Sequence, residues 1–468
     1  MKINKYIISS VFTAILIIIS SILVSCDDTI EVGTVDETNY ETTTDLMGFL
    51  TDIDGKRAID NIEFRSSGSS DFFFNASKKT TENCIISLSY DKSVLDDYNN
   101  KNDSQYEAFP VSNVNIGDNG LDSLQIGETR SNGIKISYTS SSEIKANQSY
   151  VIPIKLKVTS GNLKLNENEL SYLIFVKDMT GIPDCNKSTG IKIISCMEVN
   201  DTNPLNNLCF TLKSNGKPLI DMVILFSANI NYNEETGRVY VYNNENIQAL
   251  LNNREHYLKP LQDRGVKIIL GILGNHDRSG VANLSNSSAK LFAQELKAIC
   301  NSYHLDGVFF DDEYSSYMTP VPPGFVSPSS TAAARLFYEC KQAMPDKLTC
   351  SYVYSRTSSL PSIDGMQSGS FVDYGIHDYG RGTDLSSNYP GMSKSHMALY
   401  SQEFSLGRYT SDSNLQTLRT NGYGAHMIFA MDPNRSNLSR QMTAMQSIAK
   451  VLFDDELVYD GKPYSKDW

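Results

Sequence analysis

Eight short apolar runs follow one another between residues 191 and 431, and helical stretches separate several of them. The runs lie at residues 191–197, 219–226, 266–273, 305–310, 348–354, 371–376, 397–400 and 426–431, and the helical stretches at 246–265, 288–304 and 331–344. Buried strands that alternate with helices over about 280 residues fit a (β/α)8 barrel, the TIM barrel. A doubly wound open sheet is the alternative, but no G-x-G-x-x-G follows the first run. We therefore predict an α/β fold with a barrel at residues 191–468.

The region before the barrel has a different pattern. Residues 27–180 are rich in Ser, Thr and Asn, with short alternating segments at 84–90, 134–138 and 150–158 between turn signals. This pattern predicts an all-β sandwich that precedes the barrel, and residues 181–190 have the Gly, Pro and polar content of a linker. The stretch from SLSYDKSVLDDYNN to YEAFP resembles a β-sandwich module at the N-terminus of many secreted lipoprotein glycosidases. A spacer and a glycan-binding domain both remain open for it.

The first 26 residues have the form of a secretory leader. Lys2 and Lys5 precede an apolar stretch that ends in Leu-Val-Ser-Cys at Cys26. This resembles a bacterial lipoprotein leader, in which cleavage leaves Cys26 as the acylated N-terminus. The resemblance predicts a protein anchored to the outer membrane, and Asp27 and Asp28 resemble a signal for export to the cell surface. A membrane-spanning helix over residues 7–24 is the alternative.

Composition excludes several classes of function. The net charge of -13 argues against nucleic acid as a partner, because phosphates are bound by clustered Lys and Arg. A neutral sugar is compatible with it. Besides Cys26 there are seven cysteines without C-x-x-C spacing, so neither a zinc motif nor a complete disulfide framework is predicted. No cofactor is expected.

Polar residues at the carboxyl ends of barrel strands are candidates for a site, because TIM barrels place their active sites at that end. The candidates are Asn229, Asn231, Asn275, His276, Asp277, Asp311, Asp312, Glu313, Tyr354, His377, Asp378, Tyr379, Gln402, Glu403 and Asp432. The segment LGNHDR at residues 273–278 is similar to a motif of two-metal phosphoesterases. That family also needs Asp-x-His upstream, and no histidine here has Asp two places before it. No metal site is predicted.

The sequence DGVFFDDE at residues 306–313 places three acids after the fourth apolar run. Residues two apart on a strand point to the same side, so Phe309, Asp311 and Glu313 share one face. If that face is the barrel interior, Glu313 tops the lumen, Asp311 lies about 6.6 Å below it and Phe309 forms the layer beneath. Asp312 points away. This arrangement favours a carboxylate pair over a metal site.

The same segment resembles the Asp-Gly-x-Asp-x-Asp-x-Glu signature of glycoside hydrolase family 18. The stretches EVNDTNPLNN, DMVILFSANINY, ILGNHDRSG, SYVYSRTSS, VDYGIHDYG, HMIFAMDPNRS and PYSKDW are similar to the F-type endo-β-N-acetylglucosaminidases, which release high-mannose N-glycans. The resemblance covers about residues 191–468. Phe309 stands where many members have a second Asp, and the F-type enzymes share the Phe. Phe309 and Asp306 are expected to be structural.

The resemblance implies hydrolysis of the β-1,4 bond between the two core N-acetylglucosamines of N-glycans, through a retaining, substrate-assisted mechanism with an oxazolinium intermediate. Glu313 would be the general acid and base, with its pKa raised by a dry pocket and by Asp311. Asp311 would orient the acetamido group and Tyr379 would donate to its oxygen.

Seven further residues are predicted to bind glycan from their position alone: Asn229, Asn231, Asn275, His276, His377, Gln402 and Glu403. For His377, a filling role at the barrel mouth stays open. The one tryptophan is Trp468, so the chain lacks the stacking surface that chitinases use for crystalline chitin. An inactive glycan-binding barrel and a chitinase for short oligosaccharides are the alternative functions. We expect a monomer.

Overall fold

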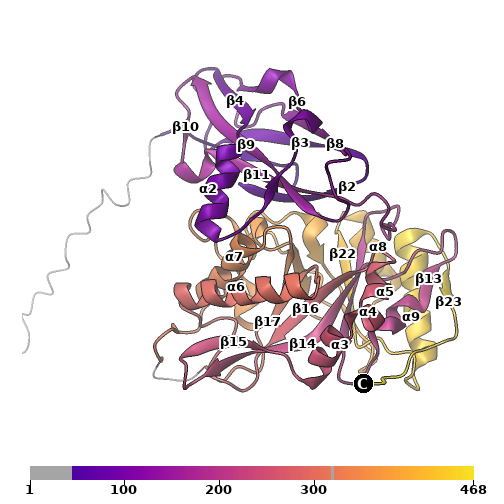
Figure 1. Cartoon of the computed structure of the whole chain (residues 1–468). Coiled ribbons are helices and arrows are strands. Elements are labelled where there is room, and N and C mark those ends of the chain that lie inside the picture. Colours follow the sequence, from indigo (N-terminus) through magenta and orange to yellow (C-terminus); the bar gives the residue numbers. More distant parts are fainter. Residues whose placement is uncertain (1–44, 318–320) are drawn as a thin grey trace, which may run out of the picture. The chain divides into compact units, whose positions relative to one another are not determined.

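A computed structural model describes residues 45–317 and 321–468 (Figure 1). The predicted leader at 1–26, with Cys26, and the pair Asp27 and Asp28 lie outside the described residues. Within the described ranges, no helix is long and apolar enough to cross a membrane.

The first part of the described chain folds into two packed sheets. One has the strand order β10-β1-β3-β8-β6, and the other has the order β2-β11-β9-β4-β7 with β5 beside β9. Phe72 and Phe74 on β3 and Ile152 and Ile154 on β9 lie fully buried in one apolar cluster, so the core lies between the sheets. The strands are β1 (Met47–Thr51), β2 (Ile59–Phe64), β3 (Ser67–Ala76), β4 (Cys84–Tyr90), β5 (Glu107–Ala108), β6 (Val114–Ile116), β7 (Leu121–Leu124), β8 (Ile134–Thr139), β9 (Ser149–Ser160), β10 (Lys164–Leu165) and β11 (Ser171–Asp178).

This part is not purely β. Helix α2 (Lys92–Asn102) follows β4, and the Asp91 carboxylate caps it by accepting a hydrogen bond from the Ser93 N–H at 3.0 Å. The cap gives the early helical N–H groups an acceptor, so this polar stretch turns helical where turns between strands are expected.

The second part of the chain forms a closed barrel of eight parallel strands within the described residues, as predicted. Its strands are β12 (Lys192–Glu198), β14 (Met222–Asn233), β16 (Lys267–Leu273), β17 (Gly307–Asp311), β18 (Leu348–Val353), β19 (Tyr374–His377) and β22 (Ala425–Phe429), with β20 (Met397–Ala398) and β21 (Gln402–Glu403) sharing the remaining place. Pairing of β12 with β22 closes the barrel. Strand β15 (Arg238–Tyr242) adds to β14 in antiparallel fashion.

The outer layer departs from the expected alternation. Helices α6 (Asn286–Ser302) and α7 (Ser330–Ala343) match the predicted stretches and pack side by side outside the barrel (Figure 1). The predicted helix at 246–265 is three short helices, α3 (Glu245–Asn252), α4 (Arg254–Tyr257) and α5 (Lys259–Gln262). Asn253 leaves helical geometry between the first two, and Pro260 lies in the first turn of the last one. In the described chain, short 3-10 turns replace helices between β18 and β20, and α8 (Asp412–Thr420) and α9 (Leu438–Phe453) complete the layer.

Side chains of β17 alternate between the two faces of the barrel wall. Phe309 joins Ile194, Ile224 and Ile269 in the cluster that fills the interior. Phe310 packs outward against Phe337 of α7, with ring centroids 4.9 Å apart. The strand parity predicted for this segment is therefore confirmed, and it places Asp311 on the interior face.

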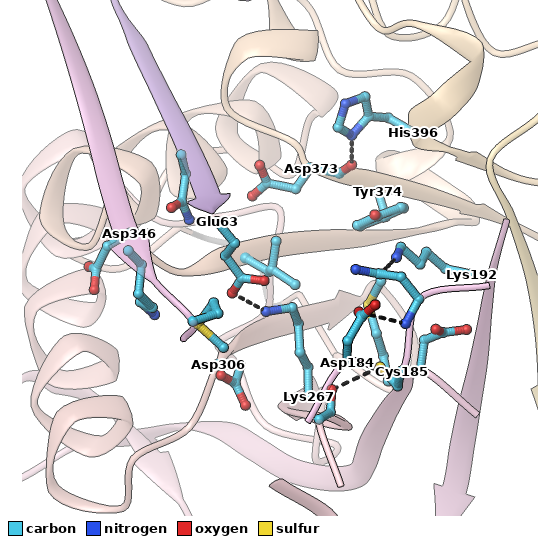
Figure 2. Close-up of a pocket in the computed structure, with 18 of the residues that line it drawn as sticks. Glu63, Asp184, Cys185, Lys192, Lys267, Asp306, Asp346, Asp373, Tyr374 and His396 are labelled. Atoms are coloured by element: carbon cyan, nitrogen blue, oxygen red, sulfur yellow. Dashed lines mark hydrogen bonds and ion pairs between the residues drawn. The ribbon is translucent and has the colours of Figure 1, made fainter. Parts of the chain in front are cut away.

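Residues 181–190 have no regular secondary structure but are held by buried contacts. The Cys185 thiol donates to the Gly265 carbonyl at 2.9 Å. The Lys187 ammonium pairs with Asp221 at 2.8 Å, and both side chains are buried. At the same end of the barrel, Glu63 of β2 points at Lys267 at the start of β16 (Figure 2). The sandwich is thus joined to the amino ends of the barrel strands by charged contacts.

The C-terminal segment runs back along the barrel. Strand β23 (Leu457–Tyr459) pairs with β13 (Phe210–Leu212), and the last residues lie against α3 and α4. Trp468 packs edge-on against Tyr257 at 4.9 Å, and its indole N–H donates to Asn246 at 3.2 Å. The end of the chain is therefore docked.

Candidate active site

A cavity of about 640 Å³ lies at the carboxyl ends of the barrel strands. Its polar lining residues are Glu198, Asn200, Ser227, Asn229, Asn244, Asp311, Glu313, Asp378 and Arg408, and its aromatic ones are Phe226, Phe309, Tyr314, Tyr352, Tyr354, Tyr379 and Phe429. Acidic and aromatic groups dominate. Such a surface suits a neutral ligand that stacks on rings and hydrogen-bonds to carboxylates.

The three residues predicted to be catalytic meet in this cavity. Asp311 ends β17, Glu313 lies two residues on, and Tyr379 follows β19 across the mouth. Phe309 lines the cavity below them, with its ring 6.3 Å from that of Tyr352. The cavity therefore has an apolar floor under two carboxyl groups.

Asp311 is almost fully buried, at 3% exposed. Its Oδ1 atom has no hydrogen-bond partner within the described residues. Burial raises the pKa of Asp311 well above its usual range, and the negative charge of Glu313 adds to this effect. An unpartnered buried carboxyl oxygen is costly, so this atom is poised to receive a donor from a ligand.

Glu313 is partly exposed at the cavity. Burial raises the pKa of Glu313, the charge of Asp378 raises it further, and the Tyr354 hydroxyl opposes the shift. Because Glu313 and Asp311 are close, the pair disfavours holding two negative charges at once. One of the two carboxyl groups then keeps its proton to a higher pH than a free carboxyl group does, which is what an acid catalyst needs.

Tyr379 is held from two sides. Its backbone N–H donates to the Asp378 carboxylate at 2.7 Å, and its ring lies 6.1 Å from that of Phe429. Burial raises the pKa of Tyr379, so its hydroxyl stays a hydrogen-bond donor. The Arg408 guanidinium lies 5.9 Å from the centre of the same ring.

Asp312 takes no part in the cavity lining. The Tyr317 hydroxyl and the Arg356 N–H donate to its carboxylate, the latter at 3.0 Å. Asp312 thus points away from the cavity, as its strand parity predicts. Its hydrogen bonds hold the loops beside the site.

Four of the seven residues predicted to bind glycan lie on β14 or directly after β16, and only Asn229 among them lines the cavity. Asn229 lines the cavity, and its amide donates to the Gly274 carbonyl at 3.1 Å. Asn275 donates to Asn231 at 3.2 Å, and Asn231 donates to Asp277 at 3.3 Å, which forms a polar cluster outside the lining. His276 packs edge-on against Tyr314, with ring centres 5.6 Å apart.

The side chains of the other three predicted binding residues hydrogen-bond to nearby groups of the protein. The His377 ring nitrogen accepts the Asp378 N–H at 3.1 Å, and Gln402 contacts His426 at 2.9 Å. The Glu403 carboxylate accepts the Ser405 N–H at 2.8 Å and also the Leu406 N–H, so it shapes the turn that leads to Arg408. None of the three is part of the cavity lining in the described chain.

Some lining residues carry no predicted role. Asp378 and Tyr354 stand among the strand-end polar residues, whereas Tyr352, Tyr314, Glu198 and Arg408 were not singled out. Strand parity would have found Tyr352, two residues before Tyr354 on β18. Asp306, expected to be structural, accepts the Ile268 N–H at 2.8 Å. Within the described ranges, no group of three acidic, His or Cys side chains is arranged to hold a metal ion.

Comparison with known proteins gives relatives for both parts of the chain. A family model described as an N-terminal domain matches residues 34–163. Two solved structures of EndoBT-3987 from Bacteroides thetaiotaomicron cover 90% of this chain and 97% of that one. The structure with a Man5GlcNAc product has a TM-score of 0.83 at 32% identity, and the structure with a Man9GlcNAc2Asn substrate has 0.76 at 31%.

Two curated relatives match more than half of the chain. Endo-β-N-acetylglucosaminidase F1 of Elizabethkingia meningoseptica is 65% identical over 280 residues, which are 59% of this chain and 83% of the relative. An endo-β-N-acetylglucosaminidase of Flavobacterium sp. (strain SK1022) is 32% identical over 283 residues, which are 60% of this chain and 86% of the relative. With the cavity described above, this identity and coverage show that the chain belongs to the endo-β-N-acetylglucosaminidase family.

Proposed function

We propose that this chain is a family 18 glycoside hydrolase that cleaves the β-1,4 bond between the two core N-acetylglucosamines of high-mannose N-glycans. One sugar stays on the asparagine. The observation that carries the proposal is the meeting of Asp311, Glu313 and Tyr379 in one cavity of a chain that is 65% identical over 280 residues to endo-β-N-acetylglucosaminidase F1. The structural relative with bound Man5GlcNAc and Man9GlcNAc2Asn supports the glycan class.

Glu313 is the proton donor in this proposal. It protonates the glycosidic oxygen as the bond to C1 breaks, and then takes a proton from the water that completes hydrolysis. Partial burial and neighbouring carboxylates raise the pKa of Glu313, which keeps the proton available. Partial exposure lets the water reach it.

The nucleophile is the acetamido oxygen of the substrate itself, which attacks C1 and forms an oxazolinium ion. The unpartnered Oδ1 atom of Asp311 accepts the acetamido N–H and offsets the positive charge that develops on the ring. The Tyr379 hydroxyl donates to the acetamido oxygen and holds it in line with C1. The second attack, by water, restores the original configuration at C1.

The decisive test is cleavage of a high-mannose glycoprotein by protein lacking residues 1–26, with the product weighed by mass spectrometry. We expect a stump of one N-acetylglucosamine. Glu313→Gln should lower kcat by about 10²- to 10⁴-fold, because the side chain loses its proton but keeps its shape. An intact glycoprotein, or a Glu313→Gln variant as fast as the parent, would contradict the proposal. Cleavage of chito-oligosaccharides alone would indicate a chitinase.

We also propose that the protein is a monomeric lipoprotein, anchored through an acylated Cys26 to the outer membrane and facing the cell surface. The Leu-Val-Ser-Cys sequence and the two following aspartates support this placement. An intact glycoprotein from outside the cell is too large to cross the outer membrane, so an enzyme exposed at the surface fits the proposed reaction.

A further inference from the structure

Asp378 is one of two cavity carboxylates that the proposed reaction leaves without a role, and Glu198 is the other. It follows β19 directly, lies between His377 and Tyr379, and lines the cavity together with Asp311 and Glu313. Asp378 thus adds a further acid to the pair at and just after the end of β17.

Two short hydrogen bonds converge on one oxygen of Asp378. Its Oδ1 atom accepts the Tyr352 hydroxyl at 2.7 Å and the Tyr379 backbone N–H at 2.7 Å. Its Oδ2 atom lies 3.4 Å from the Arg381 Nε atom, and that arginine side chain is 67% exposed. The strong contacts therefore go to the cavity tyrosines, while the arginine pair is weakened by solvent.

These bonds set the position of a ring cluster around the carboxylate pair. The Tyr352 ring stacks on Tyr354 at 6.0 Å and lies 6.4 Å from the Tyr379 ring. Without Asp378, both the Tyr352 hydroxyl and the Tyr379 backbone N–H would lose their hydrogen-bond acceptor. Both rings would then be free to turn.

The charge of Asp378 also acts on the pair. After burial, it is the largest influence that raises the pKa of Glu313, and it contributes to the raised pKa of Asp311. The other charged or titratable groups that line the cavity or influence Glu313 are Cys196, Glu198, Asp311, Asp312, Tyr314, Tyr352, Tyr354, Tyr379 and Arg408. Arg408 is exposed, so it offsets the acids only in part.

We propose that Asp378 is a positioning residue, which fixes Tyr352 and Tyr379 through its hydrogen bonds and places a negative charge beside Glu313 in the cavity. This inference rests on the proposed function, because it concerns the proton that Glu313 delivers.

Three substitutions separate the two roles of Asp378. Asp378→Asn keeps an acceptor oxygen for both hydrogen bonds and removes the charge. Tyr352→Phe keeps the charge and removes one donor. Asp384→Asn is the matched control, since this aspartate lies on the same connection, accepts the Ser386 N–H at 2.9 Å, and is no part of the cavity lining.

The test is kcat and KM as a function of pH. An acid catalyst works while protonated, so the alkaline limb of kcat reports the pKa of Glu313. Removing the negative charge of Asp378 lowers this pKa. For Asp378→Asn, the alkaline limb of kcat should therefore move to lower pH by about one unit, while KM changes little. Tyr352→Phe should lower kcat several-fold with the limb in place, and Asp384→Asn should match the parent.

A second readout does not depend on turnover. The Glu313 carboxyl is followed by NMR in protein labelled with 13C at the glutamate carboxyl carbons, and Glu313→Gln identifies its signal. We expect its titration to move to lower pH in Asp378→Asn. An unmoved or upward titration overturns the role of Asp378, whether or not the enzyme cleaves. A moved titration in a protein that leaves no one-sugar stump would instead refute the proposed function alone.

Discussion

Two adjacent aspartates at the end of β17 have opposite surroundings. Asp311 faces the barrel interior with an unpartnered oxygen, while Asp312 accepts hydrogen bonds from Tyr317 and Arg356. The first carboxyl costs stability and the second contributes to it. At the scale of the residue, the site keeps a poorly satisfied acid where a substrate donor is to bind.

Asp311→Asn should therefore stabilise the protein. The raised pKa means that the folded protein holds the Asp311 proton more tightly than the unfolded chain, whose aspartate pKa is about 3.9. The free energy of unfolding of the parent therefore falls as the pH rises from about 3.9 through the pKa of Asp311 in the folded protein. The Asp311→Asn variant lacks this loss. The difference in free energy of unfolding between the variant and the parent should therefore grow from pH 4 to neutral pH and reach about 1 to 3 kcal/mol.

Thermal melts of both proteins across this pH range measure the effect. Asp312→Asn is the matched control and should be less stable than the parent, because it loses the charge that pairs with Arg356 at 3.8 Å. An Asp311→Asn variant that melts below the parent at neutral pH would show that Asp311 has a stabilising partner.

Much of the catalytic pair could be predicted because it depends on strand parity alone. Asp311 and Phe309 had to share a face with Glu313 once β17 was a barrel strand. The roles of Gln402 and Glu403 could not be predicted this way. The Gln402 side chain contacts His426 on β22, and the Glu403 side chain is held in the turn at Ser405, and no spacing in the sequence reveals either contact.

At the scale of elements, the loop after β16 supports the loop that carries Glu313. The Gly274 N–H donates to the Glu313 carbonyl at 3.1 Å. A Cβ atom on Gly274 would lie 2.3 Å from that carbonyl oxygen and 2.4 Å from the Ser315 hydroxyl. The two loops are in contact at a point where only hydrogen fits.

Gly274→Ala should therefore lower kcat by about tenfold or more, although Gly274 does not line the cavity, because it pushes the Glu313 backbone out of place. Steady-state kinetics and circular dichroism separate this from unfolding. Gly117→Ala in the sandwich, where a Cβ meets the Lys135 carbonyl at 3.1 Å, should leave kcat unchanged. If Gly274→Ala and Gly117→Ala had the same kcat, the contact between the two loops would not be needed to hold Glu313 in place.

Strands were easier to predict than helices. The apolar runs at 266–273 and 348–354 match β16 (Lys267–Leu273) and β18 (Leu348–Val353) to within one residue, because buried parallel strands are apolar throughout. The polar connection between β18 and β19 gives no such signal, and in the structure it forms 3-10 turns.

At the scale of the whole molecule, residues 181–190 show what composition leaves out. Gly, Pro and polar content suggested a linker, yet Lys187 is buried in an ion pair with Asp221 and Cys185 bonds to Gly265. Both contacts need partners more than 30 residues away, so the local sequence gives no sign of them.

The proposed anchor makes a prediction of its own. Cys26→Ser should move the enzyme from the membrane fraction to the soluble fraction of an exporting Gram-negative host, because the acylated residue is lost. The kcat of the released protein should equal that of the anchored form, since the change lies far from the barrel in the sequence. Retention of the variant in the membrane would favour a spanning helix at residues 7–24 instead.

The docked C-terminus has an optical consequence. Trp468 is the one tryptophan of the chain and packs on Tyr257, and it is not among the residues that line the cavity. Its indole emission therefore reports whether the last residues of the chain are packed on the barrel. A fluorescence melt of this protein follows the release of these residues.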